Sequence, residues 1–440
     1  MKKYSSHTTL LLLGIILTLG FYLRIKSVGE TEVIAPLSKD AKLYYTYAYN
    51  LRYKHTYSMQ TGKSADLDSA VKPDSLCSPG YPLFLTLFID SRSDKNALNR
   101  IYLSQAILST LTLLFAFLFY KSFMPQYWSA ATSVLLALSP HLIVANSYIL
   151  TETLFCFFLV LAGWGTGKFI QNPSFKIAAI LGIILGTTNL IRPSLQYFPV
   201  VLSFFLLINF GAKKGSHLFW GILLGFTLIS APWFIRNVIS VKGESNRKLM
   251  INFLHHGMYP DFMYDGKSGT YGFPYRYDPR ADEINKDIPS VLNEISTRFL
   301  RNPSKYLLWY LVKKPIIFWS WNLIQGRDVF VYPVSASPYF YNKFFQWTHF
   351  LMYTFHGGIV FFCLFGSVMS WFPFLQNYLP HSSILIARFA SLLIIYFILI
   401  HIIGAPFPRY SIPLRPYLYG LAAFFLHILI LVFKKFRKDH

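Results

Sequence analysis

A single aspartate near the start of an aromatic segment is the first side chain of this sequence that could do acid–base chemistry. Asp40 follows Ser38, a residue type that caps helix N-termini, and Tyr44 falls on the same helical face one turn later. The helix dipole favours an ionised carboxylate in the first turn. Asp40 could therefore be a general base that takes the proton of a hydroxyl nucleophile, or it could only cap its helix.

A glutamate between two apolar segments is the second candidate. Glu152 is the sole carboxylate between Ile101 and Ser240. Acidic residues inside or at the edge of membrane spans often belong to functional sites. Glu152 could equally be a favourable charge at the N-terminus of the helix that follows it.

Three arginines could bind an anion. Arg192 and Arg236 end apolar segments, and Arg409 stands among prolines before a further apolar segment. The predicted topology places all three outside, where basic residues are disfavoured. Arginine pairs bidentately with phosphate oxygens, so we predict that Arg192 and Arg236 approach each other and contact a lipid phosphate. The alternative is that these side chains only reach towards lipid headgroups.

Motifs of other enzyme classes are missing from the sequence. It has no Walker loop, GxGxxG turn, HExxH or GxSxG elbow, which argues against nucleotide hydrolysis and the commoner hydrolase mechanisms. Cys77, Cys156 and Cys363 lack metal-ligand spacing, and His255–His256 has no spaced partner, so we interpret these two as surface histidines. These residues require no cofactor, although a divalent metal could assist phosphate chemistry.

The elements that would position these residues are membrane spans. Of the 440 residues, 54% are hydrophobic and 14% are charged, against about 25% charged in soluble domains. A span takes about 20 mostly apolar residues, and we predict ten spans. They lie near residues 8–25, 101–120, 128–149, 151–170, 177–191, 195–210, 218–235, 345–369, 383–403 and 412–433.

Basic residues decide the orientation of these spans. The chain has 41 Lys and Arg against 19 Asp and Glu, a formal charge of +22. The basic residues stand in short loops between apolar segments, which indicates membrane topology and not a nucleic-acid partner. Alternation from Lys2 and Lys3 places both termini in the cytoplasm and the polar stretches 26–100 and 241–305 outside. Any chemistry would then occur on the outer face.

The apolar segment 305–325 carries two adjacent lysines at its middle. Each lysine at the centre of a span costs roughly 2.5–3.5 kcal/mol. We therefore predict an amphipathic helix that lies in the outer interface, with Trp309, Trp319 and Trp321 at the level of the lipid headgroups.

Several short motifs follow one another in a characteristic order along most of the chain. They are Asp40-x3-Tyr44-x3-Ala48-x2-Leu51, Pro79-Gly80-Tyr81-Pro82, Thr151-Glu152-Thr153-Leu154-Phe155, Arg192-Pro193, Ala231-Pro232-Trp233 with Arg236-Asn237, and Arg409-Tyr410. Together they resemble the GT-C membrane glycosyltransferases. Within these, the sequence looks like a bacterial relative of the dolichyl-phosphate-mannose protein mannosyltransferases (glycosyltransferase family 39).

This resemblance implies a fold and a set of site residues. The fold is an all-α polytopic membrane protein of about ten transmembrane helices, with two external loops that contain short interfacial helices (the GT-C fold). The catalytic base of the family corresponds to Asp40, in the motif Lys39-Asp40, and a second acidic position corresponds to Glu152. The residues that we assign to substrate binding, with the first two expected to hold the carrier phosphate, are Arg192, Arg236, Arg409, Tyr44 and Tyr81.

We divide the chain into three parts. Residues 1–240 are expected to form an N-terminal transmembrane module with a catalytic first external loop (26–100). Residues 241–344 would be a second external loop with the interfacial helix, and residues 345–440 the C-terminal transmembrane helices.

The resemblance also implies a reaction. It would be inverting transfer of a hexose or pentose from a polyprenyl-phosphate carrier to a hydroxyl group of a glycan, lipid or protein, on the outer face of the inner membrane. The main alternative from another class is a transporter or flippase for a lipid-linked substrate, although no repeated halves are visible in the sequence. A scaffold subunit of an envelope complex is a third possibility.

Overall fold

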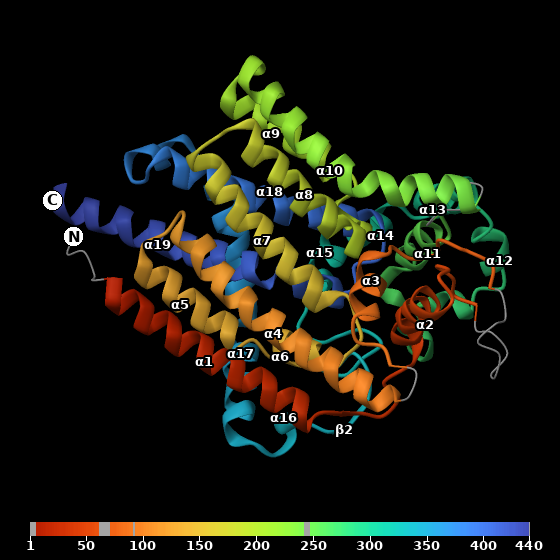
Figure 1. Ribbon diagram of the computed structural model, residues 1–440. Coiled ribbons are helices and arrows are strands. Elements are labelled where there is room, and N and C mark those ends of the chain that lie inside the picture. The colour runs from red at the N-terminus through yellow and green to blue at the C-terminus, as the bar shows by residue number, and fades with distance from the viewer. Residues whose placement is uncertain (1–5, 61–70, 91–92, 242–246, 440) are drawn as a thin grey trace.

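The computed structural model describes residues 6–60, 71–90, 93–241 and 247–439, and almost all of its secondary structure is helical (Figure 1). Within these residues, seven helices are long and apolar enough to cross a membrane, so the chain is a multi-pass membrane protein. They are α1 (Ser6–Glu30), α4 (Asp94–Lys121), α7 (Glu152–Gln171), α10 (Ala212–Val241), α17 (Lys343–Met369), α18 (His381–Ile403) and α19 (Arg415–Asp439), the last together with the 3₁₀ turn η8 (Pro408–Leu414).

The other three predicted spans are helical but broken or short. α5 (Gln126–Ala137) and the following α6 (Pro140–Val144) are bent by 55° at their junction and make an eighth span if taken as one. α8 (Phe175–Ile191) has 17 residues and α9 (Phe198–Phe210) has 13, fewer than the roughly 20 that a full span takes. All ten predicted segments are therefore helical, but only seven or eight have the length of a span.

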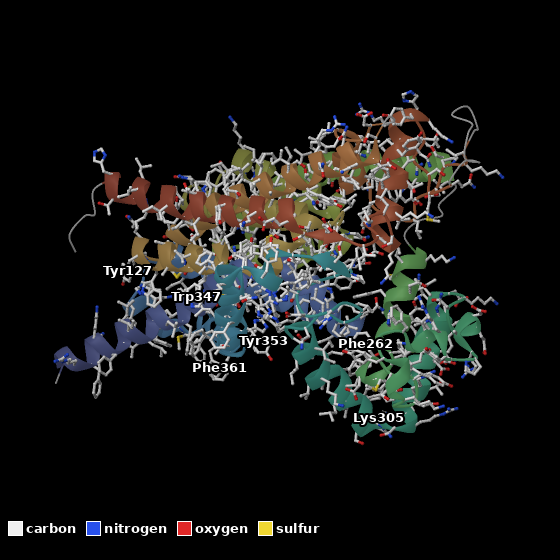
Figure 2. The ribbon with its side chains drawn as sticks, turned by 90° about the horizontal axis from the view of Figure 1, so that it is seen from below. Tyr127, Phe262, Lys305, Trp347, Tyr353 and Phe361 are labelled. Atoms are coloured by element: carbon white, nitrogen blue, oxygen red, sulfur yellow. The ribbon has the colours of Figure 1, made fainter. Side chains whose placement is uncertain are left out.

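The sides of the bundle are apolar where a bilayer would surround them. Trp347, Tyr353 and Phe361 of α17 are each at least half exposed, as is Tyr127 of α5, and Figure 2 labels them along the bundle. Exposure of these aromatic side chains to water would be unfavourable in free energy, whereas contact with lipid is favourable.

Glycines bring α8 and α10 into close contact. A Cβ atom on Gly225 would lie 2.0 Å from the carbonyl oxygen of Ala179, and one on Gly182 would lie 2.1 Å from that of Ile222. Small residues let the backbones of membrane helices approach in this way. The contact sets the position of α8 against α10, and Arg192 follows α8.

The first polar stretch forms two short helices between α1 and α4. They are α2 (Lys39–Tyr53) and α3 (Gly80–Thr86). As predicted, α2 begins directly after Ser38, but the Ser38 side chain makes no capping hydrogen bond. A two-stranded antiparallel pair, β1 (Glu32–Val33) with β2 (Val334–Ala336), joins the residues before α2 to a segment some 300 positions later; the sequence analysis did not anticipate it.

The second polar stretch folds around a small core of its own. Its helices are α11 (Arg247–Gly257), α12 (Ala281–Ile284), α13 (Ile288–Arg301) and α14 (Pro303–Leu308), with 3₁₀ turns between α11 and α12. The residues buried in this core are Ile251, Leu254, Met258, Tyr259, Ile284 and Val291. Arg298 pairs with Asp278 and Glu294 at its edge.

The predicted interfacial helix is interrupted, and its tryptophans face the protein. α14 is followed by a π-helical turn at Trp309–Lys313 and then by α15 (Lys314–Phe318). Trp309, Trp319 and Trp321 are all buried, so their expected position at exposed headgroup level is wrong. The exposed face is instead aliphatic and contains Leu307, Leu308, Leu311, Val312 and Ile316.

The two adjacent lysines of this segment also have protein partners. Lys314 is fully buried and donates hydrogen bonds to the carbonyl oxygens of Ile402 and Gly404 at 2.7 and 2.8 Å. Lys313 pairs with Asp261. The cost of burying an ammonium group is thus offset by bonds to the end of α18, which the sequence pattern could not reveal.

The two ends of the bundle differ. The start of α1 and the end of α19 lie together at one end, whereas α2, α11 and α13 lie at the other (Figure 1). This arrangement agrees with the predicted placement of both polar stretches on one side and both chain ends on the opposite side.

Candidate active site

Four of the predicted site residues meet at the end of the bundle that carries the polar stretches. Arg409 lies between the two predicted acids: its Nη2 donates to Asp40 Oδ2 at 2.7 Å, and its Nε lies 3.0 Å from Glu152 Oε1. Arg192 Nη1 approaches the same glutamate oxygen at 3.7 Å. The result is a chain of alternating charges, Asp40, Arg409, Glu152 and Arg192.

Each member of this cluster stands at the end of an element. Asp40 is in the first turn of α2, and Glu152 is the first residue of α7, where the helix dipole favours a carboxylate. Arg192 follows α8 in an extended conformation because Pro193 disfavours helical geometry in the residue before it. Arg409 is held in η8, whose prolines separate α18 from α19.

Burial differs across the cluster. Glu152 is 2% exposed, whereas 42% of the Asp40 side chain is exposed. The ring of Tyr410 lies 4.1 Å below the guanidinium of Arg192. Glu152 Oε2 and Arg192 Nη1 are buried and form no hydrogen bond with any group in the described part of the chain. Arg192 Nη1 thus pairs with Glu152 only loosely, without a hydrogen bond.

Asp40 opens onto a cleft of about 200 Å³. Its lining residues come from the first loop, the second loop and the segment around η8; they are Lys39, Asp40, His256, Tyr275, Leu323, Ile324, Gln325, Val331, Tyr332, Phe407, Arg409 and Tyr410. Glu152 and Arg192 do not line it. Glu152 instead borders a narrower cavity with His141 and Tyr148.

The charges around Asp40 keep it ionised. Burial alone would raise the pKa of its carboxyl group, but the charge and hydrogen bond of Arg409, followed by the charges of Arg192 and Lys39, lower that pKa below its ordinary value of 3.8. Asp40 Oδ2 is occupied by Arg409. The other carboxylate oxygen is the one that can accept a proton.

Tyr44 and Tyr81 lie next to this cluster but not in the cleft. Their rings meet edge to face with centroids 5.2 Å apart. Burial and then the Asp40 charge raise the pKa of Tyr44 well above 10. Tyr81 is fully buried and donates to Gln105 Oε1 at 2.8 Å. Tyr44 of α2 thus packs against Tyr81 of α3 and joins the two helices.

The structure does not bring Arg236 together with Arg192. The Arg236 guanidinium donates to the carbonyl oxygens of Asp74 and Tyr57 at 2.7 and 3.0 Å, and it lies over the ring of Trp233. No contact joins it to Arg192 within the described ranges. Arg236 thus ties the end of α10 to the first loop.

Sequence reasoning missed several residues of the cleft. Tyr332 and Gln325 come from a segment to which no site residue was assigned, and His256 was judged a surface histidine. His256 is instead partly buried: its Nε2 contacts the Gly272 carbonyl, which also accepts from Gln325 Nε2, and burial lowers the pKa of His256 to about 4. The cluster of aromatic residues in the second loop was the available signal.

The carboxylate side chains at the site are not arranged to bind a metal ion together. Among the described residues no three His, Cys, Asp or Glu side chains lie close enough to share an ion. Asp40 and Glu152 are joined through a guanidinium, which occupies the space between them.

Comparison with known proteins places this geometry in a family context. Residues 77–235 match the family model of dolichyl-phosphate-mannose-protein mannosyltransferases. That range contains Glu152 and Arg192 but not Asp40 or Arg409, which only the fold brings to them. No curated protein matched the sequence.

Solved structures share the fold over nearly the whole chain. An Archaeoglobus fulgidus oligosaccharyltransferase tethered to an acceptor peptide matches with a TM-score of 0.52 and 12% identity, over 99% of this chain and 51% of that one. The oligosaccharyltransferase AglB from the same organism, in complex with an inhibitory peptide and a dolichol-phosphate, matches with a TM-score of 0.52 and 13% identity, over 98% and 51%.

The present chain spans about half the length of these oligosaccharyltransferases, and at such identity the likeness shows the fold alone. The family match and the fold agree with the resemblance seen in the sequence. This protein therefore has the fold of the GT-C membrane glycosyltransferases, and its residues 77–235 match the dolichyl-phosphate-mannose-protein mannosyltransferases among them.

Proposed function

We propose that the protein is an inverting glycosyltransferase that moves a sugar from a polyprenyl-phosphate carrier to a hydroxyl acceptor. The observation that carries this proposal is the ionised Asp40 in an open cleft, joined through Arg409 to the buried Glu152 and to Arg192. The dolichol-phosphate in the AglB complex, and the name of the matching family, support a lipid-phosphate donor.

The reaction needs one base and a site for negative charge. The acceptor oxygen forms a bond to the anomeric carbon of the sugar, while its proton passes to the free oxygen of Asp40. The bond from that carbon to the carrier phosphate breaks, and the phosphate leaves with the electron pair. Fixed cations stabilise this developing charge, which is usually the largest catalytic contribution.

We assign different roles to the arginines. Arg409 is engaged by two carboxylates, so it orients Asp40 and keeps it ionised. Arg192 pairs with Glu152 at the longer distance of 3.7 Å and is the better ligand for the carrier phosphate. Arg236 donates to the carbonyl oxygens of Asp74 and Tyr57 and to Asn237 Oδ1, so its role is structural. Glu152, buried behind Arg409, positions both site arginines and is not itself the base.

We further propose that the site lies on the outer face of the inner membrane. The acceptor would be a protein, lipid or growing glycan that meets the carrier there. Support comes from the basic-residue pattern and from the separation of the cluster from both chain ends (Figure 1).

The test is sugar transfer by purified protein from a radiolabelled polyprenyl-phosphate sugar, with Asp40→Asn as the key variant. Asparagine keeps the shape of the side chain and leaves the start of α2 after Ser38 unchanged, but it cannot accept the proton. We expect turnover to fall by about 10² to 10⁴, the usual contribution of a general base, with an unchanged melting temperature. Near-normal turnover in Asp40→Asn would remove Asp40 from the mechanism, and transport without transfer would favour the flippase alternative.

A further inference from the structure

We propose that the acceptor carries a negatively charged group and that Lys39 recognises this group in the cleft beside Asp40. The inference rests on the proposed transferase function and adds to it the chemical class of the acceptor. It follows from the position of Lys39, from its backbone conformation and from the direction in which an inverting reaction must proceed.

Lys39 presents an available cation at the cleft. Its side chain is exposed, lines the cleft, and places Nζ 5.6 Å from the centroid of the Tyr332 ring. Within the described part of the chain it forms no ion pair, whereas Arg409, the other permanent cation of the cleft, is engaged by Asp40 and Glu152. An anionic group that enters the cleft can therefore pair with Lys39 without breaking an existing ion pair.

The backbone of Lys39 is in an unfavourable conformation for a lysine. Its φ is +48°, in the left-handed region that side chains other than glycine rarely adopt. Glycine at this position would avoid the strain. Strained residues cluster at functional sites, and here the conformation sets the ammonium group beside the candidate base.

The chemistry of inversion assigns Lys39 to the acceptor. In an inverting displacement the nucleophile and the leaving group lie on opposite faces of the sugar. Asp40 serves the nucleophile, and Arg192, which does not line the cleft, is the proposed ligand of the departing phosphate. Lys39 shares the cleft with Asp40 and therefore lies on the acceptor side.

The remaining walls suit a ring-shaped acceptor. Tyr275, Tyr332, Phe407 and Tyr410 offer aromatic surface, and His256 is uncharged at neutral pH because burial lowers its pKa to about 4. Flat aromatic faces can pack against the apolar faces of a sugar. A phosphorylated or carboxylated sugar is thus the kind of acceptor that the cleft fits.

The experiment compares glucose 6-phosphate with glucose as acceptors of the sugar from a polyprenyl-phosphate donor, using the purified full chain. We expect glucose 6-phosphate to accept the sugar with a KM about tenfold lower than that of glucose at low salt, with the difference reduced at high salt. Lys39→Met should abolish the difference and leave the KM for the donor unchanged. Lys42→Met, at an exposed position on the same helix, is the matched control and should retain the difference between the two sugars.

Lys39→Gly separates recognition from folding. We expect it to melt at the same temperature as the parent or higher, because glycine tolerates the backbone conformation, and still to lose the preference for the phosphorylated sugar. Retention of the preference in Lys39→Gly or Lys39→Met would overturn the proposal. So would a raised KM for the donor in either variant, since that would assign Lys39 to the carrier phosphate.

Calorimetric titration of the same two sugars keeps this proposal distinct from the proposed reaction. If the parent protein shows no donor turnover but binds glucose 6-phosphate through Lys39, the transferase function fails and the anion site stands. If turnover is present but neither binding of glucose 6-phosphate nor transfer to it depends on Lys39, the anion site fails and the transferase function stands.

Discussion

At the scale of single residues, the central feature is that one guanidinium serves two carboxylates of unlike exposure. Arg409 contacts Asp40 at the cleft and Glu152 in the interior. The interior pair has few alternative partners, because Glu152 is buried and removal of either member would leave an uncompensated charge. Arg409 is therefore held rigidly from behind while it positions Asp40 in front.

This arrangement predicts the acid limb of the pH–rate profile. Because Arg409 lowers the pKa of Asp40 below 3.8, the base stays ionised at neutral pH and kcat/KM should fall only below about pH 4. In Arg409→Gln the burial of Asp40 is no longer opposed by that charge, so its pKa rises and the acid limb should move to higher pH. Initial rates measured between pH 3.5 and 8 in both proteins test this expectation. An acid limb that stays in place in Arg409→Gln would contradict it.

Arg192 and Arg236 should respond differently to the same conservative change. Arg192→Lys loses the planar fork proposed to hold phosphate, so the KM for the donor should rise by about 10- to 100-fold, the equivalent of one charge-assisted hydrogen bond of roughly 1.5–3 kcal/mol. Arg236→Lys should leave that KM nearly unchanged and lower the melting temperature, because its bonds are to backbone carbonyls. Steady-state kinetics and a thermal melt of both variants test this expectation. An equal rise in the KM for the donor in both variants would indicate that Arg236 also binds the phosphate.

At the scale of elements, the site is assembled by helix ends that close packing holds in register. α8 lies against α10 through Gly182 and Gly225, which sets the position of α8 along α10, and Pro193 ends α8 so that Arg192 follows in an extended conformation. The β1–β2 pair does the same for the start of α2. The site residues are thus set by contacts that contain no site residue.

Gly225→Ala should disturb this register. Its added methyl group would meet the Ala179 carbonyl oxygen at 2.0 Å, which forces the two backbones apart. We expect a lower melting temperature and reduced transfer, with a destabilisation of about 1–3 kcal/mol, as for other overpacked cores. Gly357→Ala in α17 is the control, because no atom lies within 4 Å of its added methyl group. Equal stability of the two variants would show that the α8–α10 contact is not limiting.

The sequence predicted the helices better than the contacts between residues that are far apart in the chain. Every predicted span is helical, since apolar composition alone marks such segments. Asp40, Glu152, Arg192 and Arg409 could be grouped because each ends an apolar or polar segment on one predicted side. The bond from Arg409 to Asp40 joins residues 369 positions apart, and the partners of Arg236 and Lys314 are backbone carbonyls. No local pattern encodes such contacts, which depend on how distant helices pack.

At the scale of the whole molecule, α7 and α10 both carry lysines at the end that is remote from the site. α7 begins with Glu152 at the site and carries Lys168 sixteen residues later, roughly 24 Å away at 1.5 Å per residue. α10 ends near Arg236, beside the first loop, and begins with Lys213 and Lys214 about 33 Å away. The acidic site and the basic helix ends therefore lie on opposite sides of the bundle.

This polarity leads to a topology prediction. Because positively charged helix ends remain in the cytoplasm, and because the start of α1 and the end of α19 share the end of the bundle remote from the site (Figure 1), a phosphatase fused after Lys438 should be inactive outside the cell. A phosphatase inserted in the exposed turn at Gly266 of the second loop should be active there. The insertion also serves as the control for expression, since Gly266 has no neighbouring atom within 4 Å of an added Cβ. Activity of the C-terminal fusion outside would contradict this prediction and would require an odd number of membrane crossings between the two chain ends.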